Sequence, residues 1–385
     1  MDLSLVFDPV PEEIISLSKS DNFGGSVYAY SHEVPSLEGM ELAIIGITEN
    51  KGMISTPSGV VSSPYHIRRK LYTLKKSGIS YKIVDLGDIR NGYNLQDSYE
   101  RTTAVATYLH DLNIIPIFIG GTHDFTLPQV KALRSKGSKT HLVIMDSMVD
   151  VEGEDTSNSF LKNLTQLQNP LAYNISLIGH QSYLVGERSF EIFGNKLVNA
   201  TRLGEVKNKI HEIEPVVREA DVLSIDLSVG SNIYVGGAIG SNVFGLTGEE
   251  MCQIAWYAGM SSKMKSLGIY QYNPDMDDLE ANTALVVSVM LWYFIEGFTN
   301  RFNELDFNAD HFLIYEVPLD TDYPSIRFFK SKKSERWWME VPDAGSPDTV
   351  FMRNQMLSCS YQDYQLAMNN EIPERWFAAY TKAKL

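Results

Sequence analysis

Cysteine is scarce in this sequence: only Cys252 and Cys359 occur, far apart in a chain of 385 residues. Two thiols cannot form a disulfide framework or a cysteine-rich zinc site, and they favour a reducing compartment. The first residues, Met-Asp-Leu-Ser, also lack the basic and apolar segments of a secretory signal peptide. We therefore expect a cytoplasmic protein.

Basic charge is also in short supply, with 33 Lys and Arg against 48 Asp and Glu and a net charge of -15. An acidic protein without a basic stripe repels phosphate, so we expect no nucleic-acid partner. Long apolar runs are missing too, since a spanning helix needs roughly 18 uninterrupted apolar residues. The nearest candidate, residues 283–298, contains Glu296 and predicts a buried core helix. We expect no membrane insertion.

Several catalytic signatures are absent from the sequence. It contains no Gly-x-Ser-x-Gly elbow, no phosphate-binding Gly-x4-Gly-Lys-Ser loop and no Cys-x-x-Cys pair. What remains is an ordinary globular composition, 44% hydrophobic and 21% charged, in a chain long enough for a sizeable core.

Short apolar runs alternate with helical patterns along the chain. The runs are continuous and do not alternate with polar residues, which is typical of parallel strands covered on both faces. They lie at residues 41–47, 81–84, 114–119, 141–145, 175–178, 222–225, 266–270 and 312–315. Helical patterns lie at 65–76, 98–112, 127–134, 205–219, 248–259 and 279–297. This order predicts a three-layer α/β/α fold with a mostly parallel central sheet.

The two ends of the chain break this alternation. We predict an N-terminal extension over residues 1–40, an α/β domain over 41–318 and a C-terminal extension over 319–385. The C-terminal segment is rich in aromatic residues, among them Trp337, Trp338 and Trp376. Aromatic side chains at that density predict packing against the main domain or a partner.

Polar residues follow four of the predicted strands, where ligands sit in open parallel sheets. His123 follows the run at 114–119, Asp146 and Asp150 follow 141–145, Asp226 follows 222–225, and Gln271 follows 266–270. One histidine and three aspartates form a nitrogen and oxygen set suited to Mn²⁺ or Zn²⁺. The alternative is a hydrogen-bonded or ion-paired cluster without metal, although three clustered carboxylates would then repel one another.

Five segments resemble motifs of the ureohydrolase superfamily, which includes arginase, agmatinase and formimidoylglutamase. In the order of that family they are Gly120-Gly121-Thr122-His123-Asp124, Asp146-Ser147-Met148-Val149-Asp150, Ser224-Ile225-Asp226-Leu227-Ser228, Phe244-Gly245-Leu246-Thr247 and Gln271-Tyr272-Asn273-Pro274. The segment Ile178-Gly179-His180-Gln181-Ser182-Tyr183 is most similar to the formimidoylglutamase branch. The resemblance runs from about residue 40 to 300 and implies an arginase-like fold.

The resemblance also implies a site for two Mn²⁺ ions, the first held by His123, Asp146, Asp150 and Asp226. The second ion would need a histidine at Met148 and an aspartate at Ser228. A thioether and a neutral hydroxyl are poor ligands for Mn²⁺, so these are lost second-site positions.

Gln271 stands where arginases carry a glutamate that faces the cationic substrate, so that charge pairing is lost too.

Two functions follow from these losses. The first is a pseudoenzyme that holds one Mn²⁺ or none and acts by binding a small molecule or a protein partner. The alternative is an active metal-dependent C–N hydrolase of the formimidoylglutamase or arginase type. Single-metal deacetylases share the fold but resemble the family in keeping the second site, which disfavours that activity. A homo-oligomer is implied by the resemblance alone.

Overall fold

The central sheet is mostly parallel. The computed structural model describes residues 1–53, 58–76, 82–134, 140–165, 174–186, 188–304, 307, 310–320, 323–342 and 355–383. Within these, the strand order is β1-β4-β3-β5-β10-β9-β6-β7-β8, with β2 beside β4 and only β1 antiparallel. The strands are β1 (Phe7–Asp8), β2 (Tyr28–Ala29), β3 (Leu42–Ile47), β4 (Ile83–Ile89), β5 (Ile115–Ile119), β6 (His141–Met145), β7 (Asn174–His180), β8 (Leu197–Arg202), β9 (Val222–Asp226) and β10 (Ser266–Tyr270).

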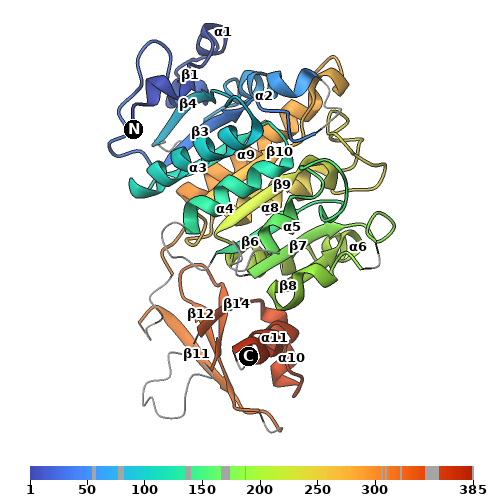
Figure 1. Cartoon of the computed structure of the whole chain (residues 1–385). Helices are drawn as coiled ribbons and strands as arrows, with labels where there is room; N and C mark the ends of the chain where they lie inside the picture. The colour runs from blue at the N-terminus through green and yellow to red at the C-terminus, as the bar shows by residue number, and fades with distance from the viewer. Residues whose placement is uncertain are drawn as a thin grey trace.

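Helices cover both faces of this sheet (Figure 1). One core contains side chains of α2 (Ser63–Leu71), α7 (Ile213–Arg218), α8 (Gly248–Gly259) and α9 (Asn282–Thr299). The other contains side chains of α3 (Leu95–Asp111), α4 (Thr126–Arg134) and α5 (Phe160–Thr165). In β5, Ile117 and Ile119 enter the first core and Phe118 the second. The predicted three-layer α/β/α fold is therefore confirmed.

The helix predicted over residues 205–219 is wrong, because the chain breaks there into α6 (Leu203–Asn208), a 3₁₀ turn (Ile210–Glu212) and α7. Lys209 leaves helical geometry, with φ -141° and ψ 52°. The break places Pro215 in the first turn of α7, where its missing N–H costs no helical hydrogen bond.

Helix α9 begins three residues later than predicted, where Asp277 accepts hydrogen bonds from the backbone N–H groups of Thr283 and Ala284. By length and composition α9 could cross a membrane. However, 61% of its 18-residue window is buried inside the protein, as in the core helix that the sequence predicted.

A second sheet follows α9 in the chain. It is antiparallel, in the order β11 (Phe312–Val317), β12 (Ile326–Ser331), β13 (Trp337–Val341) and β14 (Gln355–Cys359). Helices α10 (Tyr361–Met368) and α11 (Glu374–Ala383) follow β14. The short helix α1 (Glu12–Ile15) lies near the other end of the chain. The prediction that residues 312–315 join the parallel sheet is wrong, since β11 pairs with β12. We call β11–β14 with α10 and α11 the C-terminal module.

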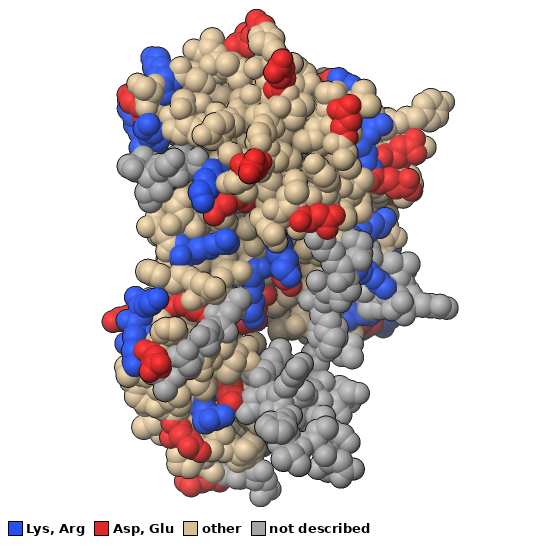
Figure 2. Space-filling view, turned by 90° about the vertical axis from the view of Figure 1, so that its left-hand side faces the viewer, with Lys and Arg blue, Asp and Glu red and all other residues tan. Residues whose placement is uncertain are grey.

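The C-terminal module lies at one end of the molecule and has its own core around the fully buried Trp376 (Figure 1). The first 40 residues instead contribute β1 and β2 to the edge of the main sheet. On the face drawn in Figure 2, acidic and basic side chains are interspersed.

Candidate metal centre

Four neighbouring strands carry the polar residues singled out in the sequence. Strands β5, β10, β9 and β6 are adjacent in the sheet and parallel, so their carboxyl ends meet at one edge. The chain leaves β5 through Gly120 and Gly121, both left-handed, with φ of 84° and 73°. A Cβ on Gly120 would lie 2.4 Å from the Ser63 hydroxyl, so glycine is required there. This turn places His123 over the sheet edge.

The structure brings His123, Asp146, Asp150 and Asp226 together, and we call this group the tetrad. Each offers one ligand atom, all four atoms lie within 4.8 Å of one another, and all four residues are buried. His123 Nδ1 lies 2.9 Å from Asp150 Oδ2 and 3.4 Å from the Oδ2 atoms of Asp146 and Asp226.

The orientation of the His123 ring is fixed from its far side. Nε2 lies 3.1 Å from the Ser224 hydroxyl, which in turn lies 2.5 Å from the Thr126 hydroxyl. A hydrogen bond donated by Nε2 to Ser224 leaves the Nδ1 lone pair free for a metal. Ser224 begins one of the five family-like motifs, but no role for it is predicted from the sequence.

Electrostatics in the tetrad favour a cation. Burial and the charge of Asp146 raise the pKa of Asp226 to about 7. Burial and the same neighbour raise the pKa of Asp150 well above its usual range. Burial lowers the pKa of His123, but the hydrogen bonds that its ring donates to Asp146 and Asp150 outweigh burial and raise that pKa well above its usual value. Three buried carboxylates thus repel one another, and a divalent ion among these hard oxygen and imidazole donors would relieve the repulsion.

Met148 and Ser228, which stand at the second-ion positions, take part in hydrogen bonds to the tetrad carboxylates. The Ser228 hydroxyl donates to Asp146 Oδ1 at 3.1 Å and accepts from the Ser147 hydroxyl at 3.0 Å. Backbone N–H groups of Met148 and Ser228 donate to Oδ1 of Asp146 and Asp226, at 2.9 and 2.7 Å. The Oδ1 oxygens of Asp146 and Asp226, which are not the atoms that face His123, therefore accept hydrogen bonds from the protein.

A small cavity opens beside the tetrad. It has a volume of about 130 Å³, and its walls include Met148, Asp150, Glu152 and Leu184. Of the four tetrad residues, Asp150 is the one that lines this cavity.

Gln271 lies at the end of β10, after Tyr270, which pairs with Asp226. Its backbone is left-handed, with φ 68°, which is uncommon for a residue other than glycine. Its side chain is 3% exposed, and among the described residues its Oε1 has no hydrogen-bond partner. A buried amide oxygen without a donor is suited to accept a hydrogen bond from a ligand.

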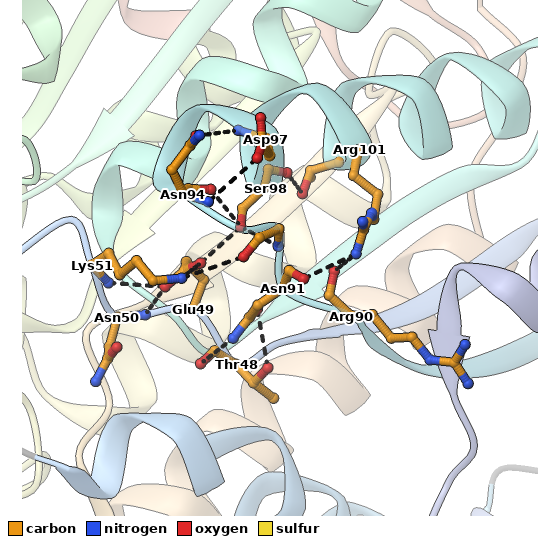
Figure 3. A network of polar contacts seen from close by, with 12 residues as sticks. Thr48, Glu49, Asn50, Lys51, Arg90, Asn91, Asn94, Asp97, Ser98 and Arg101 are labelled. Atoms are coloured by element: carbon orange, nitrogen blue, oxygen red, sulfur yellow. Dashed lines mark hydrogen bonds and ion pairs between the residues drawn. The ribbon is translucent and has the colours of Figure 1, made fainter.

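The loop after β3 supports the tetrad, a role that none of the sequence motifs predicts. Glu49, 1% exposed, accepts hydrogen bonds from the Ser98 hydroxyl at 2.7 Å and from Lys51 Nζ at 3.0 Å (Figure 3). Burial opposes ionisation, but these bonds lower the pKa of Glu49.

The Glu49 network holds Gly52 against the loop that carries His123. A Cβ on Gly52 would lie 2.3 Å from Asp124 Oδ1. The Gly52 carbonyl also accepts from the Ser157 N–H at 3.0 Å, beyond Asp150 in the chain. The signal available in sequence was Glu49 itself, a polar residue just past a strand end.

Comparison with known proteins agrees with this geometry. The model of the arginase family matches residues 40–296. The chain belongs to the arginase family. The C-terminal module lies outside the matched region.

Two curated relatives are similar to this chain in sequence. The formimidoylglutamase of Halalkalibacterium halodurans is 24% identical over 277 residues, 65% of this chain and 85% of the relative. The mitochondrial guanidino acid hydrolase of Homo sapiens is 32% identical over 124 residues, 30% of this chain and 35% of the relative. A crystal structure of Trypanosoma cruzi formiminoglutamase with Mn²⁺ has the same fold, with a TM-score of 0.61 and 19% identity over 70% of this chain and 100% of that one.

Proposed function

We propose that this protein is a metal-dependent hydrolase that cleaves a carbon–nitrogen bond in a small linear amidine of the formimino or guanidino kind. The observation that carries the proposal is the tetrad, whose four buried ligand atoms lie within 4.8 Å of one another. The names of the two relatives, a formimidoylglutamase and a guanidino acid hydrolase, support the substrate class. The proposal favours the active alternative over the pseudoenzyme.

One Mn²⁺ is the ion we assign to His123, Asp146, Asp150 and Asp226, because hard carboxylate oxygens and an imidazole suit it. A bound divalent ion supplies Lewis-acid polarisation and makes water more acidic. Ser224 keeps the His123 ring in place, and the buried walls around the tetrad exclude bulk water.

The substrate would enter through the cavity beside Asp150. An amidinium group carries N–H donors, and Gln271 Oε1 has no donor partner among the described residues. Gln271 would therefore accept a hydrogen bond from the amidinium group of the substrate. A neutral amide binds a cation less strongly than a carboxylate would. We therefore expect weaker affinity for the cationic form than a glutamate at this position would give.

A second candidate function is ligand binding without catalysis, and the second-site positions favour it. Met148 and Ser228 do not offer the imidazole and carboxylate that a second ion would need, and the Oδ1 atoms of Asp146 and Asp226 already accept hydrogen bonds from the protein. Chemistry that requires two ions could not proceed at this centre.

Turnover measured together with metal content separates the candidates. The protein is loaded with Mn²⁺, desalted and analysed by elemental mass spectrometry, and release of formamide from N-formimino-L-glutamate and of urea from 4-guanidinobutyrate is followed. Turnover that disappears in Asp226→Asn but persists in Asp21→Asn, an exposed aspartate outside the tetrad, supports the hydrolase. Bound metal without turnover of either compound supports ligand binding. Absence of bound metal rejects the metal centre.

A further inference from the structure

A second cavity, of about 510 Å³, lies where the C-terminal module meets the main domain. Its walls come from α7 and the end of α8 on one side, and from β13, the end of β14 and the start of α10 on the other. It shares no residue with the tetrad. Since the family match ends at residue 296, half of this cavity is built by a part of the chain that lies outside the match.

Arg218 lines this cavity and is only 4% exposed. Its Nη2 donates to the carbonyls of Trp337 and Cys359, both at 3.0 Å, and its guanidinium lies 4.2 Å from the ring centre of Trp338. Its Nε pairs with Glu214 at 3.2 Å. Among the described residues, neither Nε nor Nη1 has a hydrogen-bond acceptor, so Nε is held by charge alone and Nη1 has no partner. A buried charged donor without a partner points to a missing acceptor.

The carboxylates of the cavity wall already face guanidinium groups, and none of them forms a hydrogen bond with Arg218 Nη1 among the described residues. Glu214 is shared by Arg218 and by Arg336 Nε, at 3.2 and 3.3 Å. Glu212 pairs with Arg375 at 3.2 Å.

The start of α10 adds further donors to the same wall. Ser360 caps the helix, and Tyr361 and Gln362 form its first turn and line the cavity. First-turn N–H groups have no helical acceptor and carry the positive end of the helix dipole.

Aromatic side chains form much of the rest of the lining. Trp256 and Tyr257 are half-buried on the main-domain side, while Trp337 and the 54%-exposed Tyr361 lie on the module side. Aromatic faces bind flat rings well through stacking and burial. We propose that this cavity binds a small aromatic carboxylate, with its carboxylate at Arg218 Nη1 and the start of α10 and its ring between the aromatic walls.

Ligand-observed NMR on the full chain tests this proposal, with phenylacetate as the probe and phenylacetamide as its neutral counterpart. Arg218 itself is a poor first target, because it ties β13 and β14 to α7. Gln362→Glu places a carboxylate at the second position of α10, where it repels an anion but suits the helix. Gln96→Glu makes the same change at the second position of α3 and serves as the control.

We expect saturable binding of phenylacetate, binding of phenylacetamide at least about tenfold weaker, and a similar loss for phenylacetate in Gln362→Glu. Gln96→Glu should bind as the wild type does. Tyr361→Ala should weaken both compounds, since it removes ring contact and not charge. Equal binding of acid and amide, undiminished binding in Gln362→Glu, or no binding by the wild type at millimolar concentration overturns the proposal.

Discussion

Asp226→Asn perturbs the tetrad with little change in shape, and its effect on thermal stability can be worked out. Melting entropy is about 2.1 cal/mol/K per residue, or roughly 0.8 kcal/mol/K for a cooperative transition of this 385-residue chain. Mn²⁺ at a hundred times its Kd stabilises the folded state by about 2.7 kcal/mol, so it should raise the Tm by about 3 °C.

The variant should lose most of this gain. Asparagine removes one of three charged ligands, and a hundredfold loss of affinity at the same Mn²⁺ concentration leaves about 0.4 kcal/mol, or roughly 0.5 °C. Without metal the variant should melt at or above the wild type at pH 8, because one of three mutually repelling carboxylates has gone.

Differential scanning calorimetry with and without Mn²⁺ measures both effects, and Asp21→Asn serves as the control. A metal-free Asp226→Asn protein that melts well below the wild type would show that Asp226 stabilises the fold by itself. An unchanged Mn²⁺ shift in the variant would show that the ion binds elsewhere. Either result refutes the reasoning.

Three further predictions concern the same fold. Met148→His combined with Ser228→Asp should raise bound manganese from one ion to two, as measured by elemental mass spectrometry. Because the pKa of Asp226 is raised, the folded metal-free protein keeps a proton that the unfolded chain releases near pH 4. The stability that this proton contributes is present at low pH and is lost as pH rises through about 7. Between pH 5 and 8 the Tm of the metal-free protein should therefore fall, and the increase in Tm on adding Mn²⁺ should become larger, as measured by calorimetry. Arg68→Ala should cost about 3–5 kcal/mol in urea unfolding, because it leaves the fully buried Asp85 carboxylate of β4 without its ion pair.

Much of the main domain could be read from local sequence. Continuous apolar runs predicted parallel strands, and the polar residues that follow them predicted where His123, Asp146, Asp150 and Asp226 would meet. This works because parallel strands place their carboxyl ends at one edge, so local sequence suffices to locate the site. The two lost second-site positions, Met148 and Ser228, were also visible as single residue types.

Contacts between distant residues decided the rest. Glu49 and Ser98 are 49 positions apart, and nothing in either segment announces their bond. Strand β11 was assigned to the wrong sheet because an apolar run does not reveal its pairing partner. Arg218 reaches the Cys359 carbonyl across 141 positions and so builds a cavity that no motif encodes. The sequence by itself determined seven strands of the main sheet, the polar residues at their ends and the types of ligand atom. Only tertiary packing determined how those ligands are held, which oxygens remain free and where the C-terminal module adds a cavity. The reason is that these features depend on distances that only the folded chain sets.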